Sequence, residues 1–361
     1  MQLKKLILKN FRCFEDLTLE FDSNRILILG ENGSGKSSIM EAIHYLCYLK
    51  SFRTSTPKDL IKFDSDNLFI KAEFDRIEPV QAGYAGTPSS KTVKISDKKI
   101  YKFKELMQHC SAITLTEEDL AIVSGQPEIR RKLIDQQVLL HNPQQIRLYS
   151  DYKRVLENRN ALLKKKPISI ESYCLWTDKL LEISTEIKDA RIERIKAIQD
   201  EIVKLAKLNF AEFEINLKYQ EKTEGLKNSK DLLHKKFDLH KREVDWGRTL
   251  IGCHLDDILI DFNGNPAKAF ASRGQKKVIT LLIKTAQITD LLTFNRPTIF
   301  LLDDFLTDLD NSRMEQAIKM LNQLDCQMVF SCPLENIEIK NRLIGSSGQL
   351  VNIPKSRSIS A

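Results

Sequence analysis

Residues 25–38 read RILILGENGSGKSS, and this stretch decides the fold. An apolar run leads into a glycine-rich turn, and Gly30 followed by Gly35-Lys36-Ser37 completes the pattern G-x-x-x-x-G-K-[ST]. Glycines let successive backbone N–H groups curl around phosphates, and the helix that follows presents its positive end to them. The stretch therefore predicts a nucleoside triphosphate site, with Lys36 on the β- and γ-phosphates and Ser37 on Mg²⁺.

The residues after this loop predict the helix that such a site needs. Apolar side chains recur at helical spacing through Ile39, Ala42, Ile43, Leu46 and Cys47. A chance glycine-rich turn would not place a strand, a loop and an amphipathic helix in this order. We therefore expect an α/β fold with mixed β-sheets, in which the loop joins a strand to a helix.

Composition narrows the class of protein. The chain has 361 residues, with 42% hydrophobic and 29% charged residues, which describes a folded globular protein. It has no apolar run long enough for a membrane span, and its start reads as a strand and not as a signal peptide. The seven cysteines form no C-x-x-C pair, which argues against a disulfide framework or zinc site and favours a cytoplasmic protein. The net charge of +7 is compatible with an anionic partner but does not establish one.

The chain changes character along its length. Residues 1–122 are β-rich and carry the phosphate loop, and residues 123–210 form a helical lobe almost free of glycine. Residues 211–361 then hold the remaining strands, including a hairpin about Asn263-Gly264. The longest helical stretch is too short for an extended coiled-coil arm.

A second part of the nucleotide site is expected far from the loop. Residues 298–302 form a short apolar run that ends in Asp303 and Asp304, as in a buried parallel strand. Ligands bind at the carboxyl ends of such strands. Asp303 is therefore a candidate Mg²⁺ ligand beside Ser37, and Asp304 is the candidate to orient or deprotonate the attacking water.

The sequence Ser272-Arg273-Gly274-Gln275 opens another predicted helix. A serine at the N-cap, a glycine N–H and a helix N-terminus together form an anion site. One chain needs one phosphate loop, so we expect this second site to face the γ-phosphate held by another copy. ATP would then lie between two subunits of a two-fold homodimer.

The order of these motifs resembles that of ABC-type ATPases, and within them the bacterial RecF family of DNA replication and repair proteins. The resemblance runs from end to end and includes NFR (10–12), KSFR (50–53), EEDL (117–120), LENRNALLK (156–164) and GCHLDD (252–257). It implies an ABC-type ATPase head, similar to that of chromosome-maintenance proteins, with an inserted helical lobe. It also implies that ATP and Mg²⁺ are cofactors of a weak, DNA-stimulated ATPase.

The resemblance further implies partners and a role. Such proteins bind double-stranded DNA and single-strand/duplex junctions, dimerise with ATP, and act with RecR and RecO to place RecA at single-strand gaps. The expected catalytic residues are Lys36 and Asp304, and the expected metal ligands are Ser37 and Asp303. The expected nucleotide contacts are Arg12, Gly30, Glu31, Asn32, Gly33, Ser34, Gly35, Lys36, Ser37, Ser38, Ser272, Arg273, Gly274, Gln275 and Asp308.

Several positions depart from the family pattern. Glu117 stands where proline is usual, Cys253 and Leu255 replace proline and arginine, and Ser37-Ser38 replaces Thr-Asn. Asp304 is shorter than the glutamate of transporter ATPases, which favours slow hydrolysis. Two alternatives stay open: a transporter nucleotide-binding domain, in which the S-x-G-Q element lies much nearer the loop, and a non-hydrolysing DNA-binding scaffold.

Basic residues supply candidates for a DNA surface. They are Lys153, Arg154, Arg159, Lys164-Lys165-Lys166 and Lys276-Lys277. Runs of charged residues on helices are often only solvent-exposed faces. The position of each residue in the fold therefore has to distinguish a DNA-binding surface from an ordinary exposed face.

Overall fold

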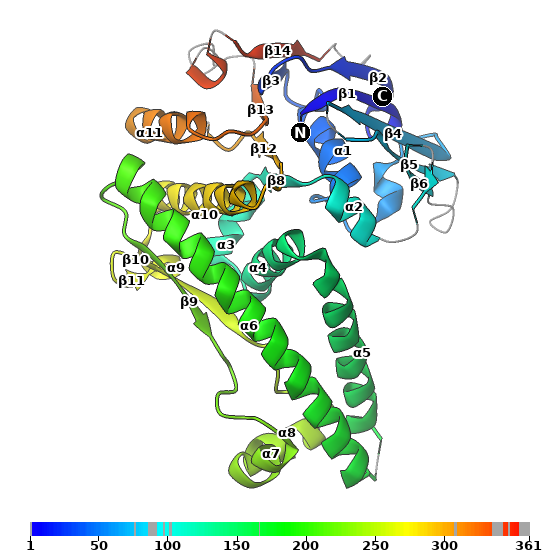
Figure 1. Ribbon diagram of the computed structural model, residues 1–361, viewed down its shortest axis with the longest axis vertical. Coiled ribbons are helices and arrows are strands. Elements are labelled where there is room, and N and C mark those ends of the chain that lie inside the picture. The colour runs from blue at the N-terminus through cyan, green and yellow to red at the C-terminus, as the bar shows by residue number, and fades with distance from the viewer. Residues whose placement is uncertain are drawn as a thin grey trace. The chain divides into compact units, whose positions relative to one another are not determined.

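A computed structural model describes residues 2–75, 77–85, 92–96, 98–100, 103–165, 167–306, 309–333, 342–345 and 347–353 (Figure 1). The chain divides into two compact units. Unit 1 comprises residues 1–120, 207–210 and 273–361, and unit 2 comprises residues 121–206 and 211–272. Residues 211–272, expected with the C-terminal half, thus belong with the helical lobe, because their strands pair with each other and contact its helix Pro127–His141 through Arg130 and Asp257.

The core of unit 1 is a five-stranded sheet whose described pairings are all parallel. In spatial order its strands are β14 (Gln349–Asn352), β3 (Arg25–Gly30), β13 (Met328–Pro333), β12 (Ile299–Asp303) and β8 (Ala112–Leu115). Strands β3 and β12 are buried almost throughout, as their continuous apolar runs predicted. Because β3, β13 and β12 are parallel neighbours, the phosphate loop and Asp303 emerge at the same edge of the sheet.

Unit 1 also contains four α-helices for which bounds are given, and two short 3₁₀ turns, among its described residues. They are α1 (Lys36–Tyr48), α2 (Phe103–His109), α10 (Arg273–Thr293) and α11 (Asn311–Asn322), with short 3₁₀ turns η1 (Pro57–Leu60) and η3 (Glu117–Leu120). The apolar face expected for α1 is confirmed, since each of its five residues is at most 1% exposed. Burial of that face fixes the helix whose N-terminus carries Lys36.

A second sheet of unit 1 is antiparallel. Its order is β2 (Phe14–Glu20), β1 (Leu3–Phe11), β4 (Asn67–Phe74), β5 (Val80–Ala85), β6 (Thr92–Ile95) and β7 (Lys98–Lys99). The apolar residues at positions 3–8, 17–21, 68–74 and 92–95 predict strands, and these residues lie in or next to β1, β2, β4 and β6. The glycine- and serine-rich stretch 81–90 predicts an exposed turn, which is wrong for residues 81–85, because they pair with β4 and β6 as part of β5. Glycine and alanine dilute the apolar pattern of that strand.

Unit 2 combines helices with a small antiparallel sheet. The helices are α3 (Ala121–Ser124), α4 (Pro127–His141), α5 (Ile146–Leu163), α6 (Ile170–Asn209, whose end reaches unit 1), α7 (Ser229–Lys235), α8 (Phe237–Trp246) and α9 (Ala267–Phe270), with the 3₁₀ turn η4 (Pro143–Gln145). The sheet has the order β11 (Asn265–Pro266), β10 (Asp257–Phe262), β9 (Ile215–Gln220). The hairpin about Asn263-Gly264 is confirmed, with φ of 49° and 77° at the two residues. The polar residues 226–243 predict a single helix, but the structure forms two there, α7 and α8.

Helices α5 and α6 lie side by side, and buried Arg159 joins them (Figure 1). Its guanidinium binds both carboxylate oxygens of Glu243 at 2.9 and 2.7 Å, and both side chains are 0% exposed. Arg159 is therefore wrong as a candidate DNA contact, because its charge is used inside unit 2. Among the described residues, no helix has the length and apolar character needed to cross a bilayer.

Candidate functional site

The loop between β3 and α1 has a backbone that only glycine accommodates at its last turn. Gly33 and Gly35 have φ of 81° and 99°, in the left-handed region that disfavours side chains. A Cβ on Gly35 would also lie 2.4 Å from the ring of Phe14 and 2.7 Å from Cys13 Sγ. The glycines of the motif therefore shape a narrow cradle at the N-terminus of α1.

The Lys36 ammonium group lies inside this cradle. Its Nζ donates to the carbonyl oxygens of Gly30 and Glu31 at 2.8 and 3.0 Å, and the residue is 8% exposed. The neighbouring Ser34 hydroxyl is buried and has no hydrogen-bond partner within the described part of the chain. A buried cation and a buried hydroxyl at a helix N-terminus fit a phosphate group.

Ser37 and Asp303 come together although 266 positions separate them in the sequence. The Ser37 Oγ donates to Asp303 Oδ1 at 3.0 Å, and Ser331 Oγ donates to the same oxygen at 2.7 Å. Hydroxyl and carboxylate oxygens are the donors that Mg²⁺ prefers. The cluster therefore fits the expected metal site beside the phosphate cradle.

Asp304 follows directly, with φ of 51°. Aspartate tolerates this left-handed backbone better than most residues, and a backbone bond supports it here, because Asp304 N donates to Ser331 Oγ at 3.0 Å. Ser331 thus contacts both acids, and the sequence analysis missed it. Ser331 could have been found from the register of β12 and β13, because their parallel pairing places Asp303 opposite Ser331.

The expected signature residues open α10. Ser272 and Arg273 are exposed, and Gly274 and Gln275 are partly exposed. A Cβ on Gly274 would lie 2.8 Å from Arg313 Nη1, so the arginine side chain passes close over this first turn. The helix start is therefore confirmed, while contact with a nucleotide on another copy stays a prediction.

The remaining candidates divide by position. Glu31, Asn32 and Gly33 are exposed at the loop tip, whereas Ser38 is buried. Arg12 makes a bidentate ion pair with fully buried Glu41 (2.8 and 2.6 Å) and donates to Asp59 O, so its guanidinium braces α1. Asp308 lies outside the described residues.

Lys277 is wrong as a candidate DNA contact, because it lies on the buried face of α10 and is 0% exposed. Its Nζ forms an ion pair with Glu117 and donates to Phe305 O at 3.1 Å. Glu117 Oε2 also lies 3.5 Å from Arg273 Nη2. The departure from proline at Glu117 therefore has a physical reason, since this carboxylate neutralises a buried ammonium next to the Asp303-Asp304 turn.

We expect Glu117→Gln to destabilise the chain by about 1–2 kcal/mol, because it leaves the Lys277 charge buried without a counter-charge. The value lies below that of a fully buried pair because the Glu117 side chain is 41% exposed. Urea unfolding followed by circular dichroism measures the change, with exposed Glu118→Gln as the control. Adding Lys277→Met should recover most of the loss, and a double variant no better than Glu117→Gln would contradict the pairing.

Two titratable groups, one on α1 and one beside the loop, are uncharged at neutral pH. Desolvation, with a smaller effect of the Lys284 charge, lowers the pKa of buried His44 on α1 to about 3. Partial desolvation raises the pKa of the thiol of Cys13, an exposed residue whose Sγ lies beside Gly35. Neither group supplies a charge or a nucleophile to the phosphate cradle at neutral pH.

The chain is similar in sequence to proteins of one family. The family model described as RecF/RecN/SMC N terminal domain matches residues 2–349. The DNA replication and repair protein RecF of Leptospira interrogans is 31% identical over 346 residues, covering 94% of this chain and 93% of the relative. The protein of the same name from Clostridium acetobutylicum is 30% identical over 350 residues, with 92% and 93% covered.

Solved structures agree on the fold. A structure of the recombination mediator protein RecF with ATP has a TM-score of 0.80 at 24% identity, covering 93% of this chain and 92% of that one. The Smc head domain from Pyrococcus furiosus has a TM-score of 0.54 at 15% identity, with 98% and 94% covered. The expected ABC-type ATPase head is thereby confirmed.

Proposed function

Because the chain belongs to the RecF family, within the group described as RecF/RecN/SMC N terminal domain, we propose that it is an ATP-dependent DNA-binding protein of replication and repair. ATP drives its homodimerisation on DNA, and slow hydrolysis releases the dimer. With RecR- and RecO-type partners it assists the placement of RecA at single-strand gaps. The name of the structural relative, a mediator with ATP in the RecFOR pathway, supports this role.

The observation that supports ATP binding best is the contact of Ser37 with Asp303 at the mouth of the phosphate cradle. In the proposed site Lys36 leaves the loop carbonyls for the β- and γ-phosphates, while Ser37 and Asp303 hold Mg²⁺. The metal supplies charge neutralisation at the phosphates when it is bound. Asp304 then accepts a proton from the attacking water or orients it.

The proposed dimer depends on Ser272 acting in trans. A ligand drives association only through contacts that exist in the dimer and not in the monomer. A γ-phosphate held by Lys36 of one subunit and by the Ser272 turn of its partner is such a contact. Hydrolysis removes that contact, so the rate of hydrolysis sets the lifetime of the dimer.

Complementation between two variants tests the arrangement. Lys36→Ala and Ser272→Ala should each fail to dimerise with ATP, as measured by size-exclusion chromatography. Their mixture should dimerise, because one site then combines an intact lysine from one chain with an intact serine from the other. If both groups acted within one chain, every chain in the mixture would carry a defect and no dimer would form. Lys50→Ala, an exposed lysine just beyond α1, is the matched control.

DNA binding is tested on the same samples. The ATP dimer should bind DNA more tightly than the monomer, and its affinity should fall linearly with the logarithm of salt concentration. Equal affinity with and without ATP would overturn the proposed switch while leaving nucleotide binding intact.

A further inference from the structure

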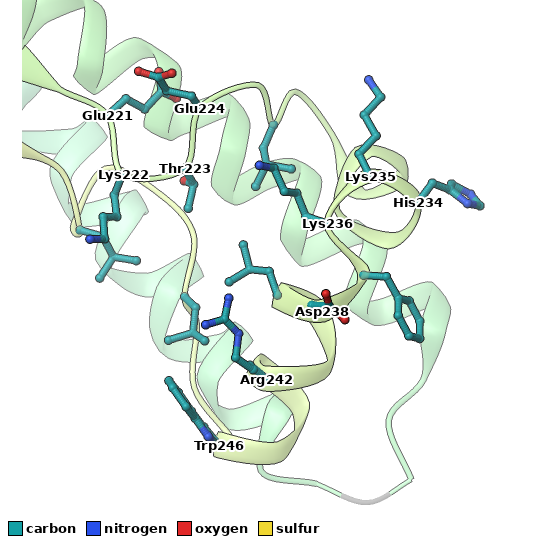
Figure 2. Close-up of a pocket in the computed structure, with 15 residues that line it drawn as sticks. Glu221, Lys222, Thr223, Glu224, His234, Lys235, Lys236, Asp238, Arg242 and Trp246 are labelled. Atoms are coloured by element: carbon teal, nitrogen blue, oxygen red, sulfur yellow. The ribbon is translucent and has the colours of Figure 1, made fainter.

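A groove of about 910 Å³ opens in unit 2 beside α7 and α8. Figure 2 shows Arg242 and Asp238 of α8 in this groove, with Lys222 and Trp246 along one side and Lys236 on the other. All of its lining residues fall between 221 and 255, within unit 2. We call it the α8 groove, and the phosphate cradle of unit 1 does not contribute to it.

Three cations of the α8 groove are not used by the fold. The side chains of Lys222, Lys236 and Arg242 form no ion pair or hydrogen bond with any part of the chain that the structure describes. The neighbouring Lys235, by contrast, binds Asp231 at 2.7 Å. Positive charge therefore remains for a ligand that carries several negative groups.

The segment that forms most of the groove carries more basic than acidic residues. Residues 222–248 contain eight lysines and arginines against five acids. One of these acids, Glu243, is fully buried and paired with Arg159, so it does not offset the surface charge. The exposed part of this segment is therefore more basic than its sequence suggests.

Two large aromatic side chains are left open at the ends of α8. Phe237 is 61% exposed and Trp246 is 55% exposed, and both line the groove. Their exposed faces give the groove two flat apolar surfaces, next to its cations, on which a ligand with aromatic rings can pack. The Arg248 guanidinium lies 5.1 Å from the centre of the Trp246 ring, which holds the indole in place without covering it fully.

This chemistry matches a nucleic acid single strand. Aromatic faces stack on unpaired bases, while lysine and arginine contact the phosphates between them. Asp238 and Glu224 also line the groove, and they can accept hydrogen bonds from base amino groups. An acidic peptide could meet the same cations, but the two exposed aromatic rings offer stacking faces for bases, which favours a nucleic acid strand.

We propose that the α8 groove binds single-stranded DNA, with Trp246 stacked on a base and Arg242, Lys222 and Lys236 on its phosphates. The choice of DNA as the polymer rests on the proposed function, whereas the stacking site rests on the groove itself. A duplex keeps its base faces stacked, so the groove distinguishes an unpaired strand from the duplex beside it. Unit 2 would thereby contribute preference for a single-strand gap.

Tryptophan fluorescence tests the stacking directly, because the chain has only Trp176 and Trp246. In a Trp176→Phe background, oligothymidine of 12 nucleotides should quench Trp246. An oligomer of the same length with abasic sites has the phosphates but no bases, and it should leave the emission unchanged. A 12-base-pair duplex should likewise leave it unchanged.

Binding of a labelled oligothymidine, measured by anisotropy, tests the energetics. Trp246→Ala should weaken binding by roughly 5- to 150-fold, the range for loss of one stacked base, and Trp246→Phe should retain most of the affinity. Arg242→Gln should reduce the slope of log affinity against log salt by roughly 0.7. Phe294→Ala in unit 1, which removes a ring that is 52% exposed, is the matched control and should have no effect.

Each opposing result overturns the proposal in a specific way. Equal quenching by abasic and normal oligomers would leave a charged surface without stacking. Quenching by polyglutamate but not by DNA would assign the groove to a protein partner, and equal affinity for thymidine monophosphate would assign it to a mononucleotide. Because ATP-dependent dimerisation is measured on the same variants, its absence together with intact quenching refutes the proposed function alone, and the reverse refutes the groove alone.

Discussion

Replacing Asp304 with asparagine is expected to give a protein that still binds ATP and dimerises but hydrolyses roughly 10²- to 10⁴-fold more slowly, the usual contribution of a positioned general base. Asparagine has the size of aspartate and shares its tolerance of positive φ, which is 51° here. The backbone bond from Asp304 N to Ser331 Oγ does not involve the side chain and survives the change. The variant therefore removes the acid and leaves the turn in place.

The same backbone explains why a glutamate is a poor replacement. Glutamate has a longer side chain that lacks the local hydrogen bonding of aspartate. A left-handed backbone conformation therefore has a higher energy for glutamate than for aspartate. The short acid and the strained turn thus belong together, which is consistent with a slow timer. Single-turnover hydrolysis and the lifetime of the ATP dimer are the measurements, with exposed Asp325→Asn as the control. An unchanged rate would assign the catalytic carboxylate elsewhere.

Replacing Glu243 with glutamine should cost about 3–5 kcal/mol of unfolding free energy, the range for breaking a buried ion pair on one side. Glu243 accepts from Arg159, from Tyr173 OH at 2.8 Å and from Leu250 N at 2.7 Å. Arg159 in turn donates to Thr249 Oγ1 at 3.0 Å, so the network links α5 to the segment after α8. Glutamine keeps the shape but leaves a fully buried guanidinium without a counter-charge.

Urea unfolding by tryptophan fluorescence isolates this effect, because Trp176 and Trp246 both lie in unit 2. The control is Glu157→Gln on α5, whose carboxylate is 65% exposed and pairs with Lys153 at 3.8 Å. We expect that control to change stability by less than about 0.5 kcal/mol. A loss of similar size in both variants would show that the buried network does not stabilise unit 2. Replacing both partners, as Arg159→Met with Glu243→Leu, should restore much of the stability.

The difference between the two sets of basic residues shows where sequence reasoning stops. Lys277 and Arg159 look like surface cations because each stands in a polar, charged run. Their carboxylate partners, Glu117 and Glu243, lie 160 and 84 positions away in the chain, and no local pattern connects them. Burial of a charge depends on such distant partners, so only the folded chain reveals it.

The sequence by itself determined the phosphate loop, its strand and helix, the acid-ending strand and the start of α10. Each of these depends on periodicity, glycine conformation and capping, which act over a few residues. The tertiary structure alone decided that Ser331 contacts both Asp303 and Asp304, that residues 211–272 join the helical lobe, and which lysines and arginines are free to meet a ligand. Those outcomes depend on strand order and on pairing between distant segments, because side-chain contacts across a fold are set by its topology and not by neighbours in the chain.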